Sequence, residues 1–245
     1  MLGALRMHAR VWASAPAAHA QPPIVLVHGL GVSSRYMIPT GERLAATHRV
    51  FAPDLPGIGR SDAPRRPYSI AENARALGDW MHECGLVNPV LVGNSYGCQV
   101  IAELLIQRPA CAAALVLSSP TIENTRRSAI GESRRLLTDA PFERLALVPV
   151  VVGDYLRAGP RTILSTLRDA IADRIEDKLP RIAQPTLLVR GARDTIVSQE
   201  WIAYLAGMMP RAAIATLEGA AHAVNFSASE AFVAAILHFT RNELM

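Results

Sequence analysis

The stretch VGNSYGCQV (residues 92–100) places Ser95 between Gly93 and Gly97. An apolar run precedes it and another follows it, which is typical of a strand that passes directly into a helix. Gly-x-Ser-x-Gly at such a junction is the nucleophile elbow, a tight turn that strains the serine backbone and leaves its hydroxyl exposed at the end of a sheet. A side chain at either glycine would collide with the neighbouring strand or helix. Ser95 is therefore a candidate nucleophile, and the backbone N–H of Tyr96 is a candidate oxyanion donor.

Strand-like and helix-like segments alternate around this turn. Short apolar segments bounded by Gly or Pro are typical of strands buried on both faces of a parallel sheet. They lie at 24–29, 49–54, 89–94, 113–119, 185–191 and 212–219. Helical periodicity marks 69–85, which starts with the capping-box pattern Ser69-x-x-Glu72, and also 96–109. The alternation predicts an α/β fold with a mostly parallel central sheet and helices on both faces.

One interval breaks the alternation. Residues 121–184 separate two predicted strands by 64 residues, far more than an ordinary crossover. Their Arg, Leu, Ala and Glu content favours several helices. We expect an inserted helical cap at 121–184 over one end of the sheet, with 1–120 and 185–245 forming the core. The apolar stretch LALVPVVV (145–152) leaves an edge strand as the alternative.

A serine hydroxyl is a weak nucleophile and needs a base held in place by a carboxylate. Of the seven histidines, His222 is the best candidate, because it lies between the last predicted strand and a terminal helix at 229–241. Asp194 follows a strand and is the best candidate for the carboxylate. Asp54 and Glu123 remain alternatives, since each also follows a predicted strand. The histidine predicts an activity that falls on the acid side near the ordinary imidazole pKa of about 6.5.

The order Ser95, Asp194, His222 resembles that of the α/β-hydrolase superfamily, specifically its capped members. VHGLG (27–31) is similar to the family's His-Gly segment, and the resemblance implies that Leu30 supplies a second oxyanion N–H. DLPGIGRSD (54–62) is similar to a family loop that shapes the site. Val197-Ser198 and Cys98 depart from common members, which have Val-Pro and a further Gly there.

The resemblance implies a serine hydrolase that cleaves a small ester or related acyl compound through an acyl-enzyme. The segment VGNS, with Asn94 before the serine, resembles the same segment in hydrolases that cleave carbon–carbon bonds of vinylogous diketones. However, Ala223 follows His222 where that branch commonly has Trp. A thioesterase, a lyase or a binding protein on the same scaffold are further alternatives. Ser95 argues against haloalkane dehalogenases and epoxide hydrolases, which place Asp at the elbow.

The amino-acid composition indicates which classes of binding partner to expect. Half of the 245 residues are apolar and the net charge is only +4, with arginines scattered rather than clustered, so we expect no nucleic-acid partner. The family resemblance implies a small-molecule substrate. The three cysteines and the remaining titratable residues show no metal-ligand spacing, so neither metal nor cofactor is expected.

The N-terminal region predicts no membrane span and no export signal. Residues 9–15 read as an edge strand and 16–23 as a turn, although Ala18-His19-Ala20 has the form of a signal-peptidase site. No apolar run approaches the length of about 18 residues that a membrane span requires. We therefore expect a cytoplasmic protein. The sequence does not indicate an oligomeric state.

Overall fold

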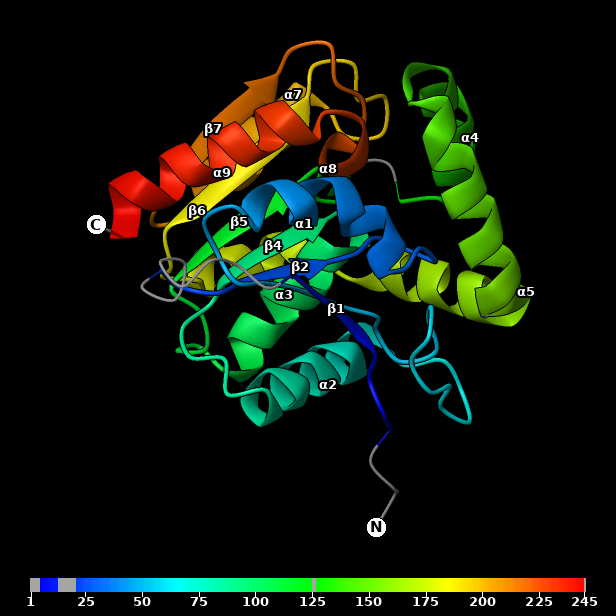
Figure 1. Ribbon diagram of the computed structural model, residues 1–245. Coiled ribbons are helices and arrows are strands. Elements are labelled where there is room, and N and C mark those ends of the chain that lie inside the picture. Colours follow the sequence, from blue (N-terminus) through cyan, green and yellow to red (C-terminus); the bar gives the residue numbers. More distant parts are fainter. Residues whose placement is uncertain (1–4, 13–20, 125–126, 245) are drawn as a thin grey trace.

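The computed structural model describes residues 5–12, 21–124 and 127–244 and holds a seven-stranded sheet (Figure 1). The strands are β1 (Ala9–Trp12), β2 (Ile24–Val27), β3 (Val50–Pro53), β4 (Val90–Asn94), β5 (Ala114–Ser118), β6 (Thr186–Gly191) and β7 (Ala212–Leu217). Their spatial order is β1-β3-β2-β4-β5-β6-β7. β1 pairs antiparallel with β3, and every other pairing is parallel. The predicted α/β fold with a mostly parallel sheet is confirmed.

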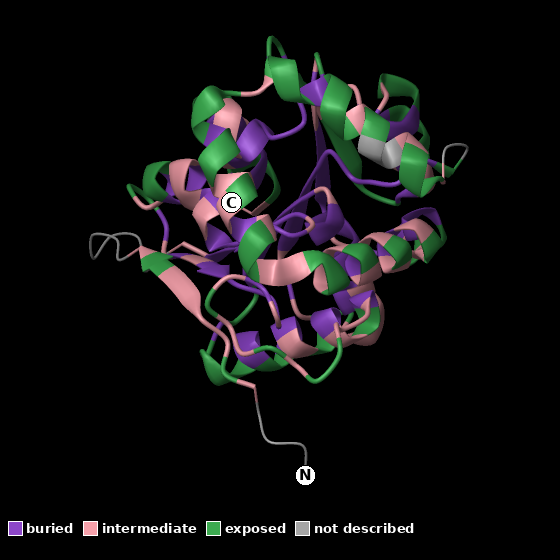
Figure 2. Cartoon of the chain, turned by 90° about the vertical axis from the view of Figure 1, so that its right-hand side faces the viewer, coloured by how far each residue is buried: buried purple, intermediate pink, exposed green. Residues whose placement is uncertain are grey.

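Helices cover both faces of the sheet (Figure 1). Because side chains alternate along a strand, Val25 and Val27 of β2 face one apolar layer while Ile24 and Leu26 face the other. The first layer is completed by α2 (Ile70–Glu83), α3 (Tyr96–Gln107) and α7 (Gln199–Met208), and the second by α1 (Ile38–Leu44) and α9 (Ser229–Leu244). Figure 2 shows buried residues gathered in the central strands and exposed ones on the outer helices. The core therefore lies on both sides of β2, β4 and β5.

The six predicted strands all form, with ends shifted by three residues or fewer. The seventh, β1, confirms the predicted edge strand within 9–15, although residues 13–20 lie outside the described part of the chain. β7 is less buried than the sequence predicts for a strand covered on both faces. Its first three residues are exposed, because β7 is the other edge of the sheet and has a neighbour on one side.

The helix predicted at 69–85 begins at its capping box. The Ser69 side chain accepts from the backbone N–H of Glu72, and the Glu72 carboxylate accepts from the Ser69 N–H. This exchange satisfies two N–H groups that a helix start leaves free. The helix ends before Gly85, whose φ of 63° places it in the left-handed region that favours glycine.

The interval 121–184 is helical in its described part. It contains α4 (Ala129–Asp139), η4 (Ala140–Phe142), η5 (Leu145–Leu147), α5 (Val148–Ala172), α6 (Ile175–Lys178) and η6 (Leu179–Arg181). The edge-strand alternative for 145–152 is wrong, because this stretch forms η5 and the start of α5. Pro149 does not prevent the helix, since it lies in the first turn, where a proline is tolerated. Gly159, with φ 76°, and Pro160 kink α5.

Two short helices lie near the loops described below: η2 (Ser34–Met37) and α8 (Val224–Ser227). Among the described residues, none of the helices combines the length and the apolar character that crossing a bilayer requires.

Candidate active site

Ser95 occupies a strained turn between β4 and α3. Its φ of 54° and ψ of −120° lie outside the regions that non-glycine residues normally adopt. A Cβ at Gly97 would lie 2.4 Å from the Val27 carbonyl oxygen, and one at Gly93 would lie 2.8 Å from Ile101 Cδ1. Both positions therefore require glycine for the turn to fit between β2 and α3.

Asp194 and His222 lie at the carboxyl ends of the neighbouring strands β6 and β7. The imidazole Nδ1 and Asp194 Oδ2 are 3.1 Å apart, and both side chains are buried. The other oxygen of Asp194 accepts from the N–H groups of Ile196 and Val197, at 2.8 and 3.0 Å. The carboxylate is therefore fixed toward the ring.

Gly191 makes this approach of the two turns possible. A Cβ on Gly191 would lie 2.2 Å from the Ala221 carbonyl oxygen, so the chain before His222 passes directly over the end of β6. A larger residue at this position would push the histidine away from Asp194.

Asn94 links the elbow to the histidine turn. Its amide donates to the His222 carbonyl oxygen at 3.2 Å, and its own oxygen accepts from the Tyr36 hydroxyl at 2.9 Å. The hydroxyl of Ser95 lies 3.4 Å from that of Thr121. Among the described residues, no hydrogen bond joins Ser95 Oγ to His222, and such catalytic contacts often tighten only when substrate binds.

The two candidate oxyanion donors flank the serine. Tyr96 is the first residue of α3, where a helix leaves its N–H groups free, and Leu30 lies in the loop after β2. In the described part of the chain, neither N–H donates a hydrogen bond outside the helices and strands. Both groups are thus available to an anion.

The two alternative carboxylates have other partners. Asp54 accepts from the N–H groups of Ser34 and Arg60 at 2.6 and 2.9 Å and lies 2.9 Å from His8 Nδ1. Glu123 accepts from the Ser198 N–H at 2.6 Å. The structure brings Asp194, rather than Asp54 or Glu123, against the imidazole of His222.

The surroundings of the pair favour an imidazolium ion. Burial lowers the pKa of His222, but the charge and hydrogen bond of Asp194, together with the charges of Asp139 and Glu143, raise it to about 9. Burial alone would raise the pKa of the Asp194 carboxyl, but His222 and the Val197 N–H hold it below its usual value. The ordinary histidine value near 6.5 expected from the sequence therefore does not apply here.

Asp139 is the last residue of α4 and Glu143 directly follows η4, and nothing in the sequence singled them out. Asp139 accepts from the His222 N–H, and Glu143 accepts from the Ala223 N–H. The contacting residues are 83 and 80 positions apart in sequence, so no local motif could have predicted these contacts.

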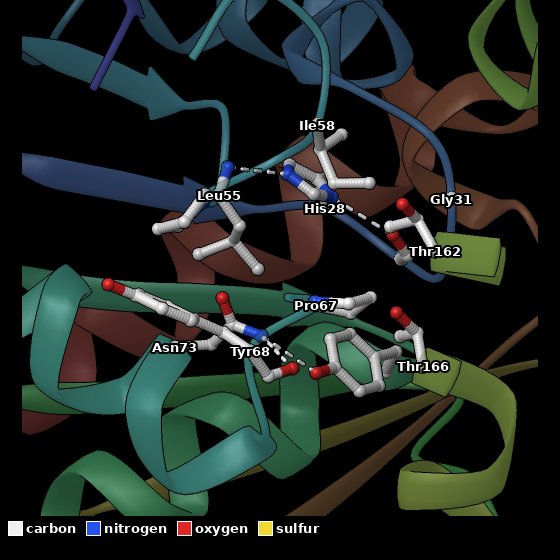
Figure 3. A pocket seen from close by; sticks show the side chains of 12 residues that line it. His28, Gly31, Leu55, Ile58, Pro67, Tyr68, Asn73, Thr162 and Thr166 are labelled. Atoms are coloured by element: carbon white, nitrogen blue, oxygen red, sulfur yellow. Dashed lines mark hydrogen bonds between the residues drawn. The ribbon is translucent and has the colours of Figure 1, made fainter. Parts of the chain in front are cut away.

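A small pocket opens beside Gly29 and Tyr96, next to the candidate oxyanion donors. It is lined by the loop after β2, by loop residues Leu55, Pro67 and Tyr68, and by α5. Figure 3 shows Thr162 and Thr166 projecting from α5 toward this pocket. His28 closes its other side and accepts from the Leu55 N–H at 3.0 Å, so this histidine serves the structure of the loop.

No group of three or more His, Cys, Asp or Glu side chains in the described residues could hold a metal ion. The three cysteines are free.

Comparison with known proteins matches residues 24–235 to the alpha/beta hydrolase family. A pimeloyl-(acyl-carrier protein) methyl ester esterase of Nitrosospira multiformis is 29% identical over 261 residues, covering 90% of this chain and 95% of that protein. A thermophilic esterase from Thermogutta terrifontis superposes with a TM-score of 0.82 at 20% identity, over 98% of this chain and 95% of that one. An E-2-(acetamidomethylene)succinate hydrolase gives the same TM-score and identity, over 98% of this chain and 96% of that one. With the family matched along most of its length, the chain belongs to the alpha/beta hydrolases.

Proposed function

We propose that the chain is a serine hydrolase that cleaves a small ester or related acyl substrate through an acyl-enzyme, with Ser95, His222 and Asp194 as its triad. The observation that carries this proposal is the Nδ1–Oδ2 contact of 3.1 Å between His222 and Asp194, at the same sheet edge as the strained Ser95. The esterase from Nitrosospira multiformis supports the choice of an ester.

In the proposed reaction, Ser95 Oγ attacks the substrate carbonyl carbon while His222 Nε2 accepts the hydroxyl proton. The N–H groups of Leu30 and Tyr96 bind the oxyanion that forms. His222 then returns its proton to the leaving alcohol as the carbon–oxygen bond breaks, leaving an acyl-Ser95 ester. Water, deprotonated by His222, attacks this ester. The bond to Ser95 Oγ then breaks as His222 returns the proton to that oxygen, and the carboxylic acid leaves.

The proposal includes a helical cap at 121–184, set on a core of 1–120 and 185–245. Its support lies in contacts of α5 with the loop that carries Leu30. Asp154 is buried and accepts from the N–H and hydroxyl of Ser33 at 2.8 and 2.6 Å. A Cβ on Gly31 would lie 2.4 Å from Ile163 Cδ1. These contacts place α5 against the loop after β2, where Thr162 and Thr166 line the pocket.

The test combines a fluorophosphonate probe with a panel of aryl esters of increasing acyl length. We expect the wild-type chain to react with the probe and to hydrolyse the shorter esters. Ser95→Ala should abolish both, while the circular dichroism spectrum stays unchanged. A Ser95→Ala variant that kept most of its esterase activity would refute the assignment.

A vinylogous diketone and an acyl thioester belong in the same panel. Faster Ser95-dependent turnover of either compound would replace the ester by that substrate class. Absence of both labelling and turnover would favour a binding protein.

A further inference from the structure

Asp139, the last residue of α4, joins the two turns that carry the proposed acid and base. One of its oxygens accepts from the backbone N–H of Thr195, directly after Asp194, at 3.2 Å. The other accepts from the His222 N–H at 3.4 Å. The carboxylate is buried, with 3% of the residue exposed. One side chain of the inserted segment therefore bridges the turns after β6 and β7.

Glu143 lies just beyond η4 and extends the same arrangement by one residue. Its Oε1 accepts from the Ala223 N–H at 2.6 Å, and its Oε2 accepts from the Ser227 hydroxyl. Consecutive N–H groups of the histidine turn, those of His222 and Ala223, are thus both bound by carboxylates from the segment 139–143. Two separate side chains therefore hold the turn.

The arrangement also concentrates negative charge around one ring. His222 faces Asp194 from the turn after β6, Asp139 from α4 and Glu143 from the chain after η4. Tyr36 of η2 lies close to the same carboxylates and stays neutral, because burial raises its pKa well above the ordinary value. Burying a carboxylate costs free energy unless its surroundings compensate, and burial raises the pKa of Asp139 to about 6. A buried acid of this kind is typical of a functional site.

We propose that Asp139 and Glu143 are positioning residues that hold the backbone turn at His222 and Ala223 and keep two carboxylates beside the proposed base. This inference rests on the proposed function for its catalytic meaning. It goes beyond the proposed triad because it assigns a role to two residues outside the triad and the oxyanion donors.

Two conservative variants separate the contributions. Asp139 uses a separate oxygen for each N–H, so in Asp139→Asn one of the two becomes an amide nitrogen that cannot accept from Thr195 or His222, and the charge is also lost. In Glu143→Gln the amide can still accept from Ala223 and donate to Ser227, so the loss is mainly that of charge. Asp177→Asn is the matched control, since Asp177 is an exposed acid of the same segment paired with Arg174.

The first measurement is the pH profile of kcat for an aryl ester. The wild-type rate should rise as His222 loses its proton, with a midpoint near the imidazole pKa of about 9. We expect Asp139→Asn to lower this midpoint by about one pH unit, because a neighbouring negative charge is lost. Its plateau rate should fall about tenfold as the turn loses its bridge. Glu143→Gln should shift the midpoint in the same direction by less, and Asp177→Asn should leave the profile unchanged.

The second measurement does not need activity. Proton NMR of the imidazole resonances, with His222 assigned by its loss in His222→Ala, gives the titration midpoint of this ring directly. A lower midpoint in Asp139→Asn supports the inference, and a midpoint equal to that of wild type overturns it. If Asp139→Asn does not fold, the same criterion applies to Glu143→Gln.

The two proposals can fail separately. If wild-type hydrolysis requires Ser95 but both variants keep the wild-type profile, the positioning role is wrong and the serine hydrolase stands. If hydrolysis does not require Ser95, the proposed function is wrong, and the NMR midpoint still decides whether Asp139 and Glu143 set the basicity of His222.

Discussion

At the scale of single residues, Asp194 follows β6 and Glu123 follows β5, but their carboxylates bind different partners. Asp194 binds the His222 imidazole, whereas Glu123 binds the Ser198 N–H. We expect Asp194→Asn to lower kcat by about 10⁴-fold, because an asparagine stabilises the wrong imidazole tautomer. Glu123→Gln keeps an acceptor for Ser198 and should cost less than about tenfold. Steady-state kinetics on one ester gives both values, and the reverse ranking would make Glu123 the acid.

Residues differ in how far the sequence could identify them. Ser95 and its glycines lie within five consecutive positions, so a local pattern suffices to predict the turn. Asp194 and His222 follow from their order after predicted strands. Asp139 and Glu143 could not be predicted, because they contact the histidine turn only through the packing of the inserted helices. A buried carboxylate whose backbone partners are distant in sequence cannot be predicted from a local sequence pattern.

At the scale of elements, the elbow requires α3 to start directly against β2. An alanine Cβ at Gly97 would lie 2.4 Å from the Val27 carbonyl oxygen, and this backbone atom cannot move aside cheaply. We expect Gly97→Ala to lower the free energy of unfolding by about 1–3 kcal/mol, the usual cost of overpacking, and to reduce turnover by displacing Ser95. Urea denaturation followed by circular dichroism measures the first effect.

Gly207 provides the control for this prediction. It lies near the end of α7, and a Cβ there would meet no atom within 4 Å. Gly207→Ala should therefore be neutral or stabilise the protein by up to about 1 kcal/mol, since alanine has the higher helix propensity. Equal destabilisation by both substitutions would show that the elbow does not depend on the close contact.

The elements themselves were largely predictable because their patterns are local. Strand segments bounded by Gly or Pro and the capping box of α2 gave ranges close to the observed ones. Residues 145–152 were ambiguous, since a short apolar run suits a strand as well as a buried helix. The low burial of β7 could not be predicted either, because it depends on which strand forms the edge of the sheet.

At the scale of the whole molecule, helices α4 and α5 meet the sheet at the loops that follow β2, β6 and β7. Asp154 of α5 binds Ser33, while Asp139 of α4 binds Thr195 and His222. The sequence predicted a helical insertion from its length and composition, but these contacts depend on how α4 and α5 pack. Substrate choice should therefore depend on this packing as well as on the proposed triad.

The last prediction concerns the pocket between α5 and the core. Thr162 lines the small pocket beside the candidate oxyanion donors. If a long acyl chain extends along α5 at this position, Thr162→Phe should obstruct it. We expect the ratio of kcat/KM for octanoyl over acetyl aryl esters to fall by about tenfold or more, the scale at which a pocket discriminates chain length. Leu156→Phe is the control, because Leu156 lies on the same helix and is 79% exposed. It should leave the ratio unchanged. If Thr162→Phe also left the ratio unchanged, the acyl chain would bind elsewhere, and α5 would contribute to the site only through its contacts with the loop after β2.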